Sequence, residues 1–437
     1  MRAPILVPQR ARVRRWFRQA AMGRAAGAAS ASLGATMAAA AAPRRRVLIL
    51  VENLPVPLDR RVWLEATALV AEGYEVSVIC PRGRGWMAPF EERDGVFIYR
   101  YPEPPEAHRG AFSYAREYLH ALWHSARLAR RVWRERGGFD VIQGCNPPDL
   151  LFLIALMFRH RGVRFLFDHH DVSPELFEAK FGRKGPLHRA MLLCERLSFA
   201  VASVSIATNE SFRQIAMERG RMAAEDVFVV RSAPLVEAFR PRPVDPAVRQ
   251  GAASVLGYVG VIGQQEGMDL LVAAVAELVA AGRDVRAVVV GFGPQLPAVR
   301  RDVAARGLAA RFTFSGALYG EELLRVLSSC DIGLSPDPKN AMNDISTMNK
   351  VMEYMALELP VVQFDLTEGR ASAGEAALYA KANDPKDFAA KIGWLIDHPE
   401  AARAMGQLGR RRVSEALSWA HSTPQLLAAY RRIFEKR

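Results

Sequence analysis

Residues 346–362, STMNKVMEYMALELPVV, have the pattern of one helix followed by one strand. Ser346 and Thr347 are of the residue types that cap helix N-termini. The apolar residues of the expected helix then recur at helical spacing: Met348, Val351, Met352 and Met355. Leu359-Pro360 ends the helix, and a short apolar run follows. The stretch therefore predicts an αβ unit of an α/β protein.

The polar residues of this stretch suggest a ligand. Lys350 and Glu353 are three residues apart and emerge near each other on another face of the helix. A helix N-terminus with spare amides and an adjacent lysine can bind a phosphate, so Thr347, Met348, Asn349 and Lys350 are candidate phosphate ligands. Glu353, one turn further on, can accept hydrogen bonds from the vicinal hydroxyls of a sugar. Together they predict a nucleotide-sugar diphosphate site; an ordinary capped surface helix is the alternative.

Short apolar runs alternate with longer amphipathic stretches on either side of a central region. The first series of expected strands is 47–52, 76–80, 96–101, 140–144, 164–168 and 204–209, and the second is 254–260, 285–291, 311–316, 331–336, 360–364 and 376–380. Continuous apolar runs separated by helical patterns predict parallel sheets that are covered on both faces. The fold class is therefore α/β, with two Rossmann-like, doubly wound domains facing a shared cleft.

Residues 231–249 contain four prolines and read as the linker between the two domains. We predict an N-terminal domain over residues 45–235, a C-terminal domain over 236–420, and a terminal helix over 421–437 that packs back on the N-terminal domain. A chain of 437 residues is long enough for two such domains.

The net charge of +13 is concentrated near the N-terminus. Ten arginines lie in residues 1–46, and no acidic residue precedes Glu52. Residues 1–44 lack the apolar centre of a signal peptide, so we expect a disordered basic leader, or translation that starts near Met37. A basic arm that touches anionic lipid is the alternative. The rest of the chain is only mildly basic, which argues against nucleic acid as a partner.

The four cysteines stand far apart and have no metal-ligand spacing, which favours a reduced, cytoplasmic protein. The longest uninterrupted apolar run, 150–158, is far shorter than the roughly 20 residues of a spanning helix. The expected helix over 112–136 interleaves arginines with aromatic residues. It is either a solvated helix with an apolar underside or a face that meets an anionic membrane surface.

Several residues stand where ligands of α/β proteins bind, just after expected strands. Gly260 and Gly263 follow one strand of the second series, and Gly291 and Gly293 follow the next. A backbone without side chains can approach a phosphate closely, although these glycines do not form the GxGxxG pattern of a dinucleotide site. They are candidate donor-binding residues or simple turn residues.

In the first domain, Asp59, Arg60 and Arg61 begin a helix directly after a strand. Two guanidinium groups at a helix N-terminus suit the phosphate of a lipid-linked acceptor. Asn146, in the sequence NPPD, also follows a strand and either shapes the acceptor side or turns the chain. The alternative for the arginines is a capped helix with exposed side chains.

Taken in order, the motifs of this chain resemble the retaining glycosyltransferases of family four, which have the GT-B fold, over residues 45–435. The resemblance is closest to the subgroup that builds bacterial O-antigens and exopolysaccharides. It rests on the stretches NLPVPLDRRVWLEA (53–66), GYEVSVICP (73–81), CNPPDLLF (145–152), FDHHDVSPELFEAKFG (167–182), TNESFRQIA (208–216), YVGVIGQQEG (258–267) and STMNKVMEYMA (346–356).

The chain departs from the family pattern at three places. Of two glutamates separated by seven residues, Glu353 matches the second, whereas Ile345 occupies the position of the first. Asp344 or Asn343 is the candidate replacement. Val261 and Glu266 stand where an arginine and a lysine commonly neutralise the pyrophosphate. In the N-terminal domain, Pro55-Val56-Pro57 replaces a pair of glycines.

The resemblance implies an N-terminal acceptor domain and a C-terminal nucleotide-sugar domain. It assigns catalytic roles to His170, which precedes Asp171 in a His-Asp pair facing the donor sugar, and to Asp344 and Glu353. The expected partners are a nucleoside-diphosphate sugar and an undecaprenyl-linked or saccharide acceptor, at the inner membrane face. No metal or other cofactor is expected, since GT-B enzymes are typically metal-independent and the chain contains no DxD sequence.

Two further functions remain open at this point. A GT-B sugar-nucleotide epimerase has the same architecture and needs no membrane. An inactive GT-B scaffold of a polysaccharide synthesis complex would account for the missing first glutamate.

Overall fold

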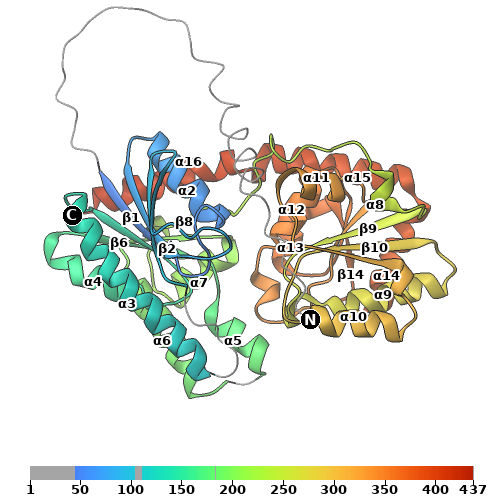
Figure 1. Ribbon diagram of the computed structural model, residues 1–437, viewed down its shortest axis with the longest axis horizontal. Coiled ribbons are helices and arrows are strands. Elements are labelled where there is room, and N and C mark those ends of the chain that lie inside the picture. The colour runs from blue at the N-terminus through green and yellow to red at the C-terminus, as the bar shows by residue number, and fades with distance from the viewer. Residues whose placement is uncertain (1–44, 104–110, 183, 437) are drawn as a thin grey trace, which may run out of the picture.

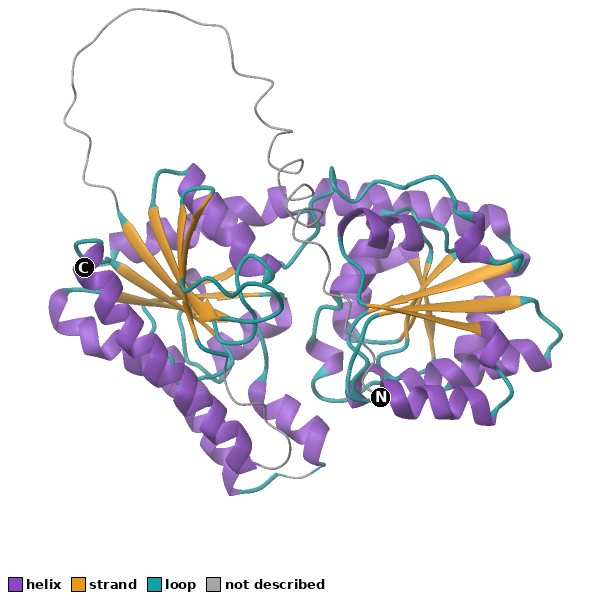
Figure 2. Ribbon diagram, in the orientation of Figure 1, coloured by secondary structure: helices purple, strands orange, loops and turns teal. Residues whose placement is uncertain are grey.

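The computed structural model describes residues 45–103, 111–182 and 184–436, which form two α/β lobes (Figure 1). The predicted leader, residues 1–44, lies outside the described residues. Figure 2 shows that each lobe is a twisted sheet with helices on both of its faces. The predicted α/β fold class with two parallel sheets is confirmed.

The N-terminal lobe contains an eight-stranded sheet in the order β3-β4-β2-β1-β5-β6-β7-β8. Its strands are β1 (Arg46–Leu50), β2 (Glu75–Pro81), β3 (Phe90–Arg93), β4 (Val96–Tyr101), β5 (Val141–Cys145), β6 (Arg164–His169), β7 (Val204–Ala207) and β8 (Val227–Val229). Only β3 runs antiparallel to its neighbour. Apart from Arg46, Glu75 and Arg164 at their amino ends, the central strands β1, β2, β5 and β6 are buried because helices cover both faces.

One face of this sheet packs against α2 (Arg60–Ala71) and α16 (Trp419–Glu435), and the other packs against α3 (Ala111–Glu135), α4 (Phe152–Phe158) and α6 (Pro186–Val201). The lobe also contains α5 (Ser173–Phe181) and α7 (Glu210–Glu218). Within the described residues, no helix is long and apolar enough to cross a membrane.

The C-terminal lobe contains a six-stranded parallel sheet in the order β11-β10-β9-β12-β13-β14. Its strands are β9 (Ser254–Val259), β10 (Val285–Val290), β11 (Phe312–Gly316), β12 (Ile332–Ser335), β13 (Val361–Phe364) and β14 (Ala377–Ala380). The helices are α8 (Pro246–Arg249), α9 (Met268–Ala280), α10 (Leu296–Ala305), α11 (Gly320–Leu327), α12 (Asn349–Ala356), α13 (Thr367–Ala373), α14 (Pro385–Asp397) and α15 (Pro399–Arg412). The order of the strands reverses between β9 and β12, where ligands of such sheets bind.

The chain passes between the lobes twice, and the two crossings touch each other. The first crossing follows β8, and the second joins α15 to α16. The Arg231 amide donates to Ser422 Oγ at 3.1 Å, and the Trp419 amide donates to the Pro234 carbonyl at 3.4 Å. The predicted linker is not free of packing, because Phe239 is buried in the core of the C-terminal lobe.

Helix α16 returns the end of the chain to the N-terminal lobe (Figure 1). Its apolar side packs into the core beside α2, β7 and β8. Tyr430 of this helix is fully buried, and its hydroxyl donates to Gln143 Oε1 at 2.6 Å. The N-terminal lobe is therefore completed by residues from the opposite end of the sequence.

Each predicted apolar run forms a strand, and two strands were not predicted. Strand β3, FEER, lies at the sheet edge and has no apolar run, because neither of its faces is buried. Strand β8 is only three residues long and lies at the other edge. Strand β3 thus lacks the apolar run on which the prediction depended, whereas β8, VFV, is apolar but too short to stand out as a strand.

Candidate functional site

The loops that follow the strands of the two sheets meet where the lobes touch. Asn209, just after β7, donates from Nδ2 to Thr347 Oγ1 at 3.0 Å and to the Ile345 carbonyl at 2.9 Å. Arg60, at the start of α2, forms an ion pair with Glu353 of α12. Ligands of doubly wound sheets bind at the carboxyl ends of the strands. This boundary between the lobes is therefore the candidate functional site.

Helix α12 begins at Asn349, so its N-cap lies one or two residues beyond the cap residues that the sequence suggests. Ser346 Oγ donates to the Met342 carbonyl at 2.7 Å, and Thr347 Oγ1 accepts the bond from Asn209. Met348 occupies the N-cap position and makes no side-chain capping bond. The prediction that Ser346 and Thr347 cap the helix is therefore wrong, because both hydroxyls have other partners. The first amides of α12 lack an acceptor from the cap side chain, as an anion site at a helix N-terminus requires.

Lys350 is buried at this helix start and is not a plain surface lysine. Its Nζ lies 2.7 Å from Asp337 Oδ1 and 3.5 Å from Glu266 Oε2. Burial lowers the pKa of Lys350, but Asp337, Tyr258 and Glu266 outweigh this and raise the pKa well above its usual value. Burial raises the pKa of Glu266 to about 7 despite the lysine. Lys350 is thus a charged ammonium whose charge is already balanced by Asp337.

Glu353 lies one turn into α12 and faces the other lobe. Its side chain is 8% exposed, and it is ion paired with Arg60. The structure therefore brings Glu353 and Arg60 together, although the sequence placed one on the donor and the other on the acceptor. Lys350 is paired with the Asp337 carboxylate, and Glu353 is paired with the Arg60 guanidinium. The two residues therefore do not pair with each other, as they would on an ordinary capped surface helix.

Two of the candidate glycines are explained by contact between loops. A Cβ at position 291 would lie 1.8 Å from the Gly260 carbonyl oxygen, and one at position 293 would lie 2.3 Å from the Ile262 carbonyl oxygen. Gly291 also has a φ of +148°. Gly291 and Gly293 thus let the loops after β9 and β10 pack backbone against backbone at the carboxyl ends of these strands. Gly263 directly precedes the short 3₁₀ helix Gln264–Glu266 of the same loop.

Asp344 has structural partners on both of its carboxylate oxygens. Oδ1 accepts from the Thr367 amide at 2.9 Å and lies 3.2 Å from Lys339 Nζ, and Oδ2 accepts from Thr367 Oγ1 at 3.1 Å. Burial raises the pKa of Asp344, but the Thr367 and Lys339 hydrogen bonds lower it below its usual value. In this arrangement Asp344 holds the start of α13, and its catalytic assignment stays a prediction.

His170 directly follows β6 and belongs to a buried charge network. Its Nε2 lies 2.7 Å from Asp168 Oδ2. Asp168 Oδ1 in turn accepts from Arg61 Nη2 at 2.8 Å, and Arg61 Nε lies 3.0 Å from Glu65 Oε1. Gln143 Nε2 donates to Glu65 at 2.7 Å and to Asp168 at 3.0 Å. These contacts fix the imidazole and leave its Nδ1 edge for other partners.

The network sets the protonation of its members. Burial lowers the pKa of His170, but the Asp168 carboxylate outweighs burial and raises the pKa above its usual value. Burial raises the pKa of Asp168, but Arg61 and His170 pull it far below its usual range. Burial raises the pKa of Glu65 to about 8, against the pull of Arg61. Asp168 is therefore the permanent anion of the network.

Arg61 and Asn146 are buried inside the N-terminal lobe, and their acceptor-binding assignment stays a prediction. Arg61 is 8% exposed, and besides the carboxylates it donates to the Val230 carbonyl at 2.5 Å. Asn146 is buried; its Oδ1 accepts from the His170 and Asp171 amides at 2.6 and 3.1 Å, and its Nδ2 donates to the Asp171 carbonyl at 2.6 Å. Both residues support the loop that carries His170.

Four residues of the network around His170 were missed by the sequence analysis: Asp168, Glu65, Gln143 and Tyr430. The one available signal was a polar residue inside an otherwise apolar strand, as in VIQGC and RFLFD. Their association depends on β5, β6, α2 and α16 meeting in three dimensions. The neighbouring His169 packs against Phe167, Phe199 and Phe212, as expected for a side chain on the opposite face of the strand.

Donor atoms of four residues of this network lie within 4.8 Å of one another, as in a metal site: Glu65, Cys145, Asp168 and His170. The carboxylates already accept from Arg61 and Gln143. Burial raises the pKa of the Cys145 thiol well above its usual value, which disfavours the thiolate that binds metals. The residues fit an internal charge network better than a cation.

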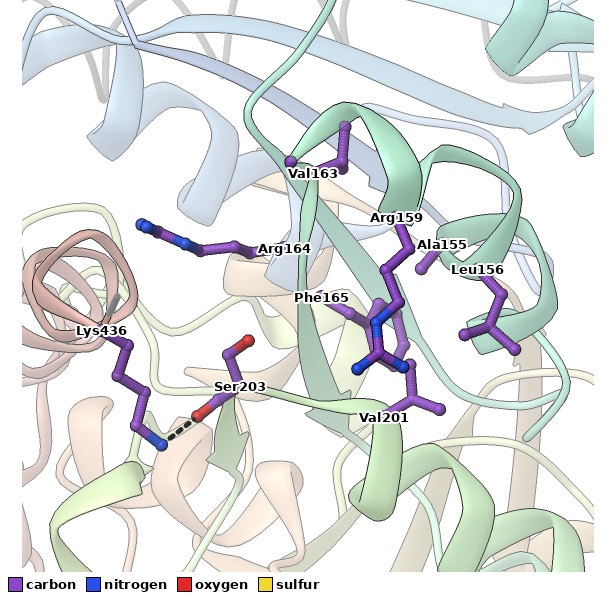
Figure 3. Close-up of a pocket in the computed structure, with 10 residues that line it drawn as sticks. Ala155, Leu156, Arg159, Val163, Arg164, Phe165, Val201, Ser203 and Lys436 are labelled. Atoms are coloured by element: carbon purple, nitrogen blue, oxygen red, sulfur yellow. Dashed lines mark hydrogen bonds between the residues drawn. The ribbon is translucent and has the colours of Figure 1, made fainter.

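Two cavities of the described residues lie away from this boundary. One, of about 330 Å³, is shown in Figure 3 and is lined by Arg159, Arg164 and Lys436 among others. Arg164 begins β6, so this cavity lies at the amino ends of the strands. The other, of about 430 Å³, lies between α7 and α16. The carboxyl ends of the strands remain the place where a ligand is expected.

Comparison with known proteins identifies the chain. The family described as "Glycosyl transferases group 1" matches residues 253–398, and "Glycosyl transferase 4-like domain" matches residues 58–233. A 2-deoxystreptamine glucosyltransferase of Streptomyces kanamyceticus is 30% identical over 335 residues, covering 73% of this chain and 84% of the relative. An MMP α-(1→4)-mannosyltransferase of Mycolicibacterium hassiacum is 25% identical over 354 residues, covering 76% of this chain and 83% of the relative.

Solved structures agree on the fold. Sucrose-phosphate synthase of Thermosynechococcus elongatus superposes with a TM-score of 0.71 at 18% identity, covering 90% of this chain and all of that chain. HepE of Anabaena in complex with UDP and glucose superposes with a TM-score of 0.67 at 15% identity, covering 89% of this chain and all of that chain. With both lobes matched by family and by fold, the chain belongs to the group 1 glycosyltransferases and is a glycosyltransferase of the GT-B fold.

Proposed function

We propose that this glycosyltransferase moves a sugar from a nucleoside-diphosphate donor to a lipid-linked or saccharide acceptor, with retention of configuration, in cell-surface polysaccharide synthesis. One observation carries the donor side of the proposal. Glu353, the carboxylate expected on the ribose, lies at the boundary between the lobes, one turn into a helix whose first amides have no side-chain cap. The complex of the HepE relative with UDP and glucose is consistent with such a donor.

The donor is proposed to lie against the C-terminal lobe. Its diphosphate faces Met348, Asn349 and Lys350 at the start of α12, and the ribose hydroxyls face Glu353. Backbone amides and a lysine stabilise a leaving diphosphate without a metal, so no metal cofactor is proposed.

His170 is proposed to face the donor sugar from the N-terminal lobe. Its Nε2 is engaged by Asp168, so the contact with a sugar hydroxyl is made by Nδ1. Asp168 and Arg61 then act as positioning residues that hold the imidazole in one orientation.

The acceptor is proposed to reach the enzyme at a membrane surface. Helix α3 exposes Leu119 and Trp123, with 61% and 58% of their areas accessible. Exposed arginines continue the same helical stripe on either side: Arg116, Arg127, Arg130 and Arg134. An apolar centre flanked by arginines suits the head-group region of an anionic bilayer. A peripheral location at the inner membrane face follows from this proposal.

Two steps test the function. The first measures the thermal stability of the protein with a panel of UDP-, GDP-, ADP- and dTDP-sugars, because a bound donor raises the apparent melting temperature. The second incubates the stabilising donor, with its sugar radiolabelled, with a membrane lipid extract. Label in the lipid fraction supports the proposal. Conversion of the donor to another sugar nucleotide would indicate an epimerase, and stabilisation by none of the donors would indicate a scaffold.

A further inference from the structure

The candidate donor site in the C-terminal lobe is short of positive charge. Lys350 is its buried cation, and it is surrounded by Asp337 at 2.7 Å and Glu266 at 3.5 Å, with Glu353 one turn away. Even with Glu266 protonated, Asp337 alone neutralises the lysine. A nucleoside diphosphate brings at least two further negative charges, which favours an additional cation close to the bound phosphates.

A further cation reaches one of these carboxylates from the other lobe. Arg60 begins α2, and its guanidinium forms an ion pair with Glu353 Oε1. The Arg60 side chain is 39% exposed, so it is not enclosed in the way that Arg61 is. Its guanidinium also lies 5.7 Å from the centre of the Phe239 ring. These contacts hold a solvent-accessible guanidinium beside Glu353, one turn into α12.

A second arginine of the N-terminal lobe approaches the same side of the C-terminal lobe. The Arg84 guanidinium lies 4.9 Å from the centre of the Phe292 ring. Phe292 stands between Gly291 and Gly293, in the loop that packs against the loop after β9. Positive charge from the N-terminal lobe therefore borders the donor loops at two separate points.

We infer that Arg60 is a donor-binding residue supplied across the lobe boundary, where it contacts the diphosphate of the nucleotide sugar. The inference rests on the proposed donor site and deepens it. A guanidinium has five N–H donors, so Arg60 can keep its bond to Glu353 Oε1 and donate others to phosphate oxygens. Glu353 Oε2 remains able to accept from a ribose hydroxyl. Arg60 thus replaces, from the facing lobe, the charge that Val261 and Glu266 do not provide, and it is not an acceptor ligand.

The arrangement makes donor affinity depend on the contact between the lobes. Separation of the lobes would take Arg60 away from the diphosphate and leave the C-terminal site with Lys350 and its carboxylates. The complete donor site therefore exists only while α2 and α12 face each other.

The test compares nucleotide binding by wild type and Arg60→Gln. Calorimetry with UDP, GDP, ADP and dTDP first selects the diphosphate that wild type binds most tightly, and the matching monophosphate and nucleoside complete the series. Loss of a charge-assisted bond to phosphate should weaken diphosphate binding by roughly tenfold or more, and nucleoside binding by much less. Arg306→Gln is the control, because Arg306 at the end of α10 is also an exposed, ion-paired arginine. This variant should change none of the three affinities.

Three results are distinguishable. If Arg60→Gln weakens binding of the diphosphate, the monophosphate and the nucleoside equally, Arg60 acts only through Glu353. If diphosphate binding is unchanged, Arg60 lies outside the site. Either result overturns the inference and leaves the proposed donor site standing. Glu353→Gln supplies the comparison, since loss of a ribose contact weakens all three ligands. If wild type binds none of the diphosphates, the proposed donor site is wrong and the inference is wrong with it.

Discussion

At the scale of single residues, the His170–Asp168 pair has a measurable consequence. Asp168→Asn keeps the size of the side chain but removes the anion that holds the imidazole at 2.7 Å. We expect the pKa of His170 to fall and kcat to fall by up to about 100-fold, because a displaced catalytic group loses its productive geometry. Histidine NMR signals measure the pKa, with His170→Gln identifying the signal. An unchanged His170 pKa would contradict the positioning role.

The same pair makes stability depend on pH. Asp168 raises the pKa of His170 above its ordinary 6.5, so this stabilisation is complete below pH 6.5 and is lost as the pH rises through the folded-state pKa. Glu65 also makes the protein less stable as the pH rises. Burial raises its pKa from 4.5 to about 8, so its ionisation lowers the free energy of unfolding between these pH values. Urea unfolding at several pH values should therefore show a falling free energy of unfolding from pH 6 to 8.5, with a shallower slope in Asp168→Asn.

Glu353 is the residue on which the donor assignment depends. Glu353→Gln keeps the shape of the side chain but weakens the hydrogen bonds that a carboxylate accepts from ribose hydroxyls. Removal of such a charge-assisted contact should weaken binding of the selected nucleoside diphosphate by about tenfold. Glu277→Gln, on the exposed side of α9, is the control. Unchanged affinity in calorimetry would remove Glu353 from the binding site.

At the scale of elements, the loops after β9 and β10 share one closely packed backbone contact. In Gly291→Ala the new Cβ would lie 1.8 Å from the Gly260 carbonyl oxygen, so the loops must separate. We expect a loss of about 1–3 kcal/mol in the free energy of unfolding, together with weaker donor binding. Gly307 also has a positive φ, but an added Cβ there would meet open space. Gly307→Ala should therefore lower the free energy of unfolding by less than Gly291→Ala does, and it should leave donor binding unchanged. Equal effects of the two variants would contradict this account.

Helix α16 couples the end of the chain to the charge network through a single hydrogen bond. Tyr430→Phe removes the hydroxyl that donates to Gln143 Oε1 at 2.6 Å and leaves a buried acceptor unsatisfied. The free energy of unfolding should fall by about 1–3 kcal/mol in urea denaturation. Tyr319→Phe, at an exposed tyrosine, should have almost no effect. If both variants unfold alike, the bond contributes nothing to the N-terminal lobe.

At the scale of the whole molecule, the two lobes differ in the surfaces they present. Trp123→Ser in α3 of the N-terminal lobe should reduce cosedimentation with phosphatidylglycerol vesicles by severalfold, because it removes the apolar centre of an arginine-rich stripe. Trp394→Ser, at a tryptophan of α14 that is 41% exposed, is the matched control in the C-terminal lobe. High salt should also weaken vesicle binding. Equal binding by wild type and Trp123→Ser would exclude this face as the membrane contact.

Apart from β3 and β8, the strands of the described residues could be predicted from the sequence, because buried parallel strands are continuous apolar runs. Strand β3 could not, since FEER contains no apolar run, and β8 could not, since it is only three residues long. Glu353 and His170 could be selected as site residues by the motifs that surround them. Their partners could not be predicted, because Arg60 is 293 residues from Glu353 in sequence and Tyr430 is 287 residues from Gln143.

The sequence by itself thus determined two doubly wound lobes and the segments that face their boundary, because local hydrophobic periodicity and strand-end position are properties of short stretches. Only the tertiary structure decided which charges meet. It enclosed Arg61 and Asn146 within the N-terminal lobe, balanced Lys350 with Asp337, and brought Arg60 across to Glu353. Pairing of buried charges depends on distances of a few ångströms between elements, and those distances are set by how the sheets and helices pack.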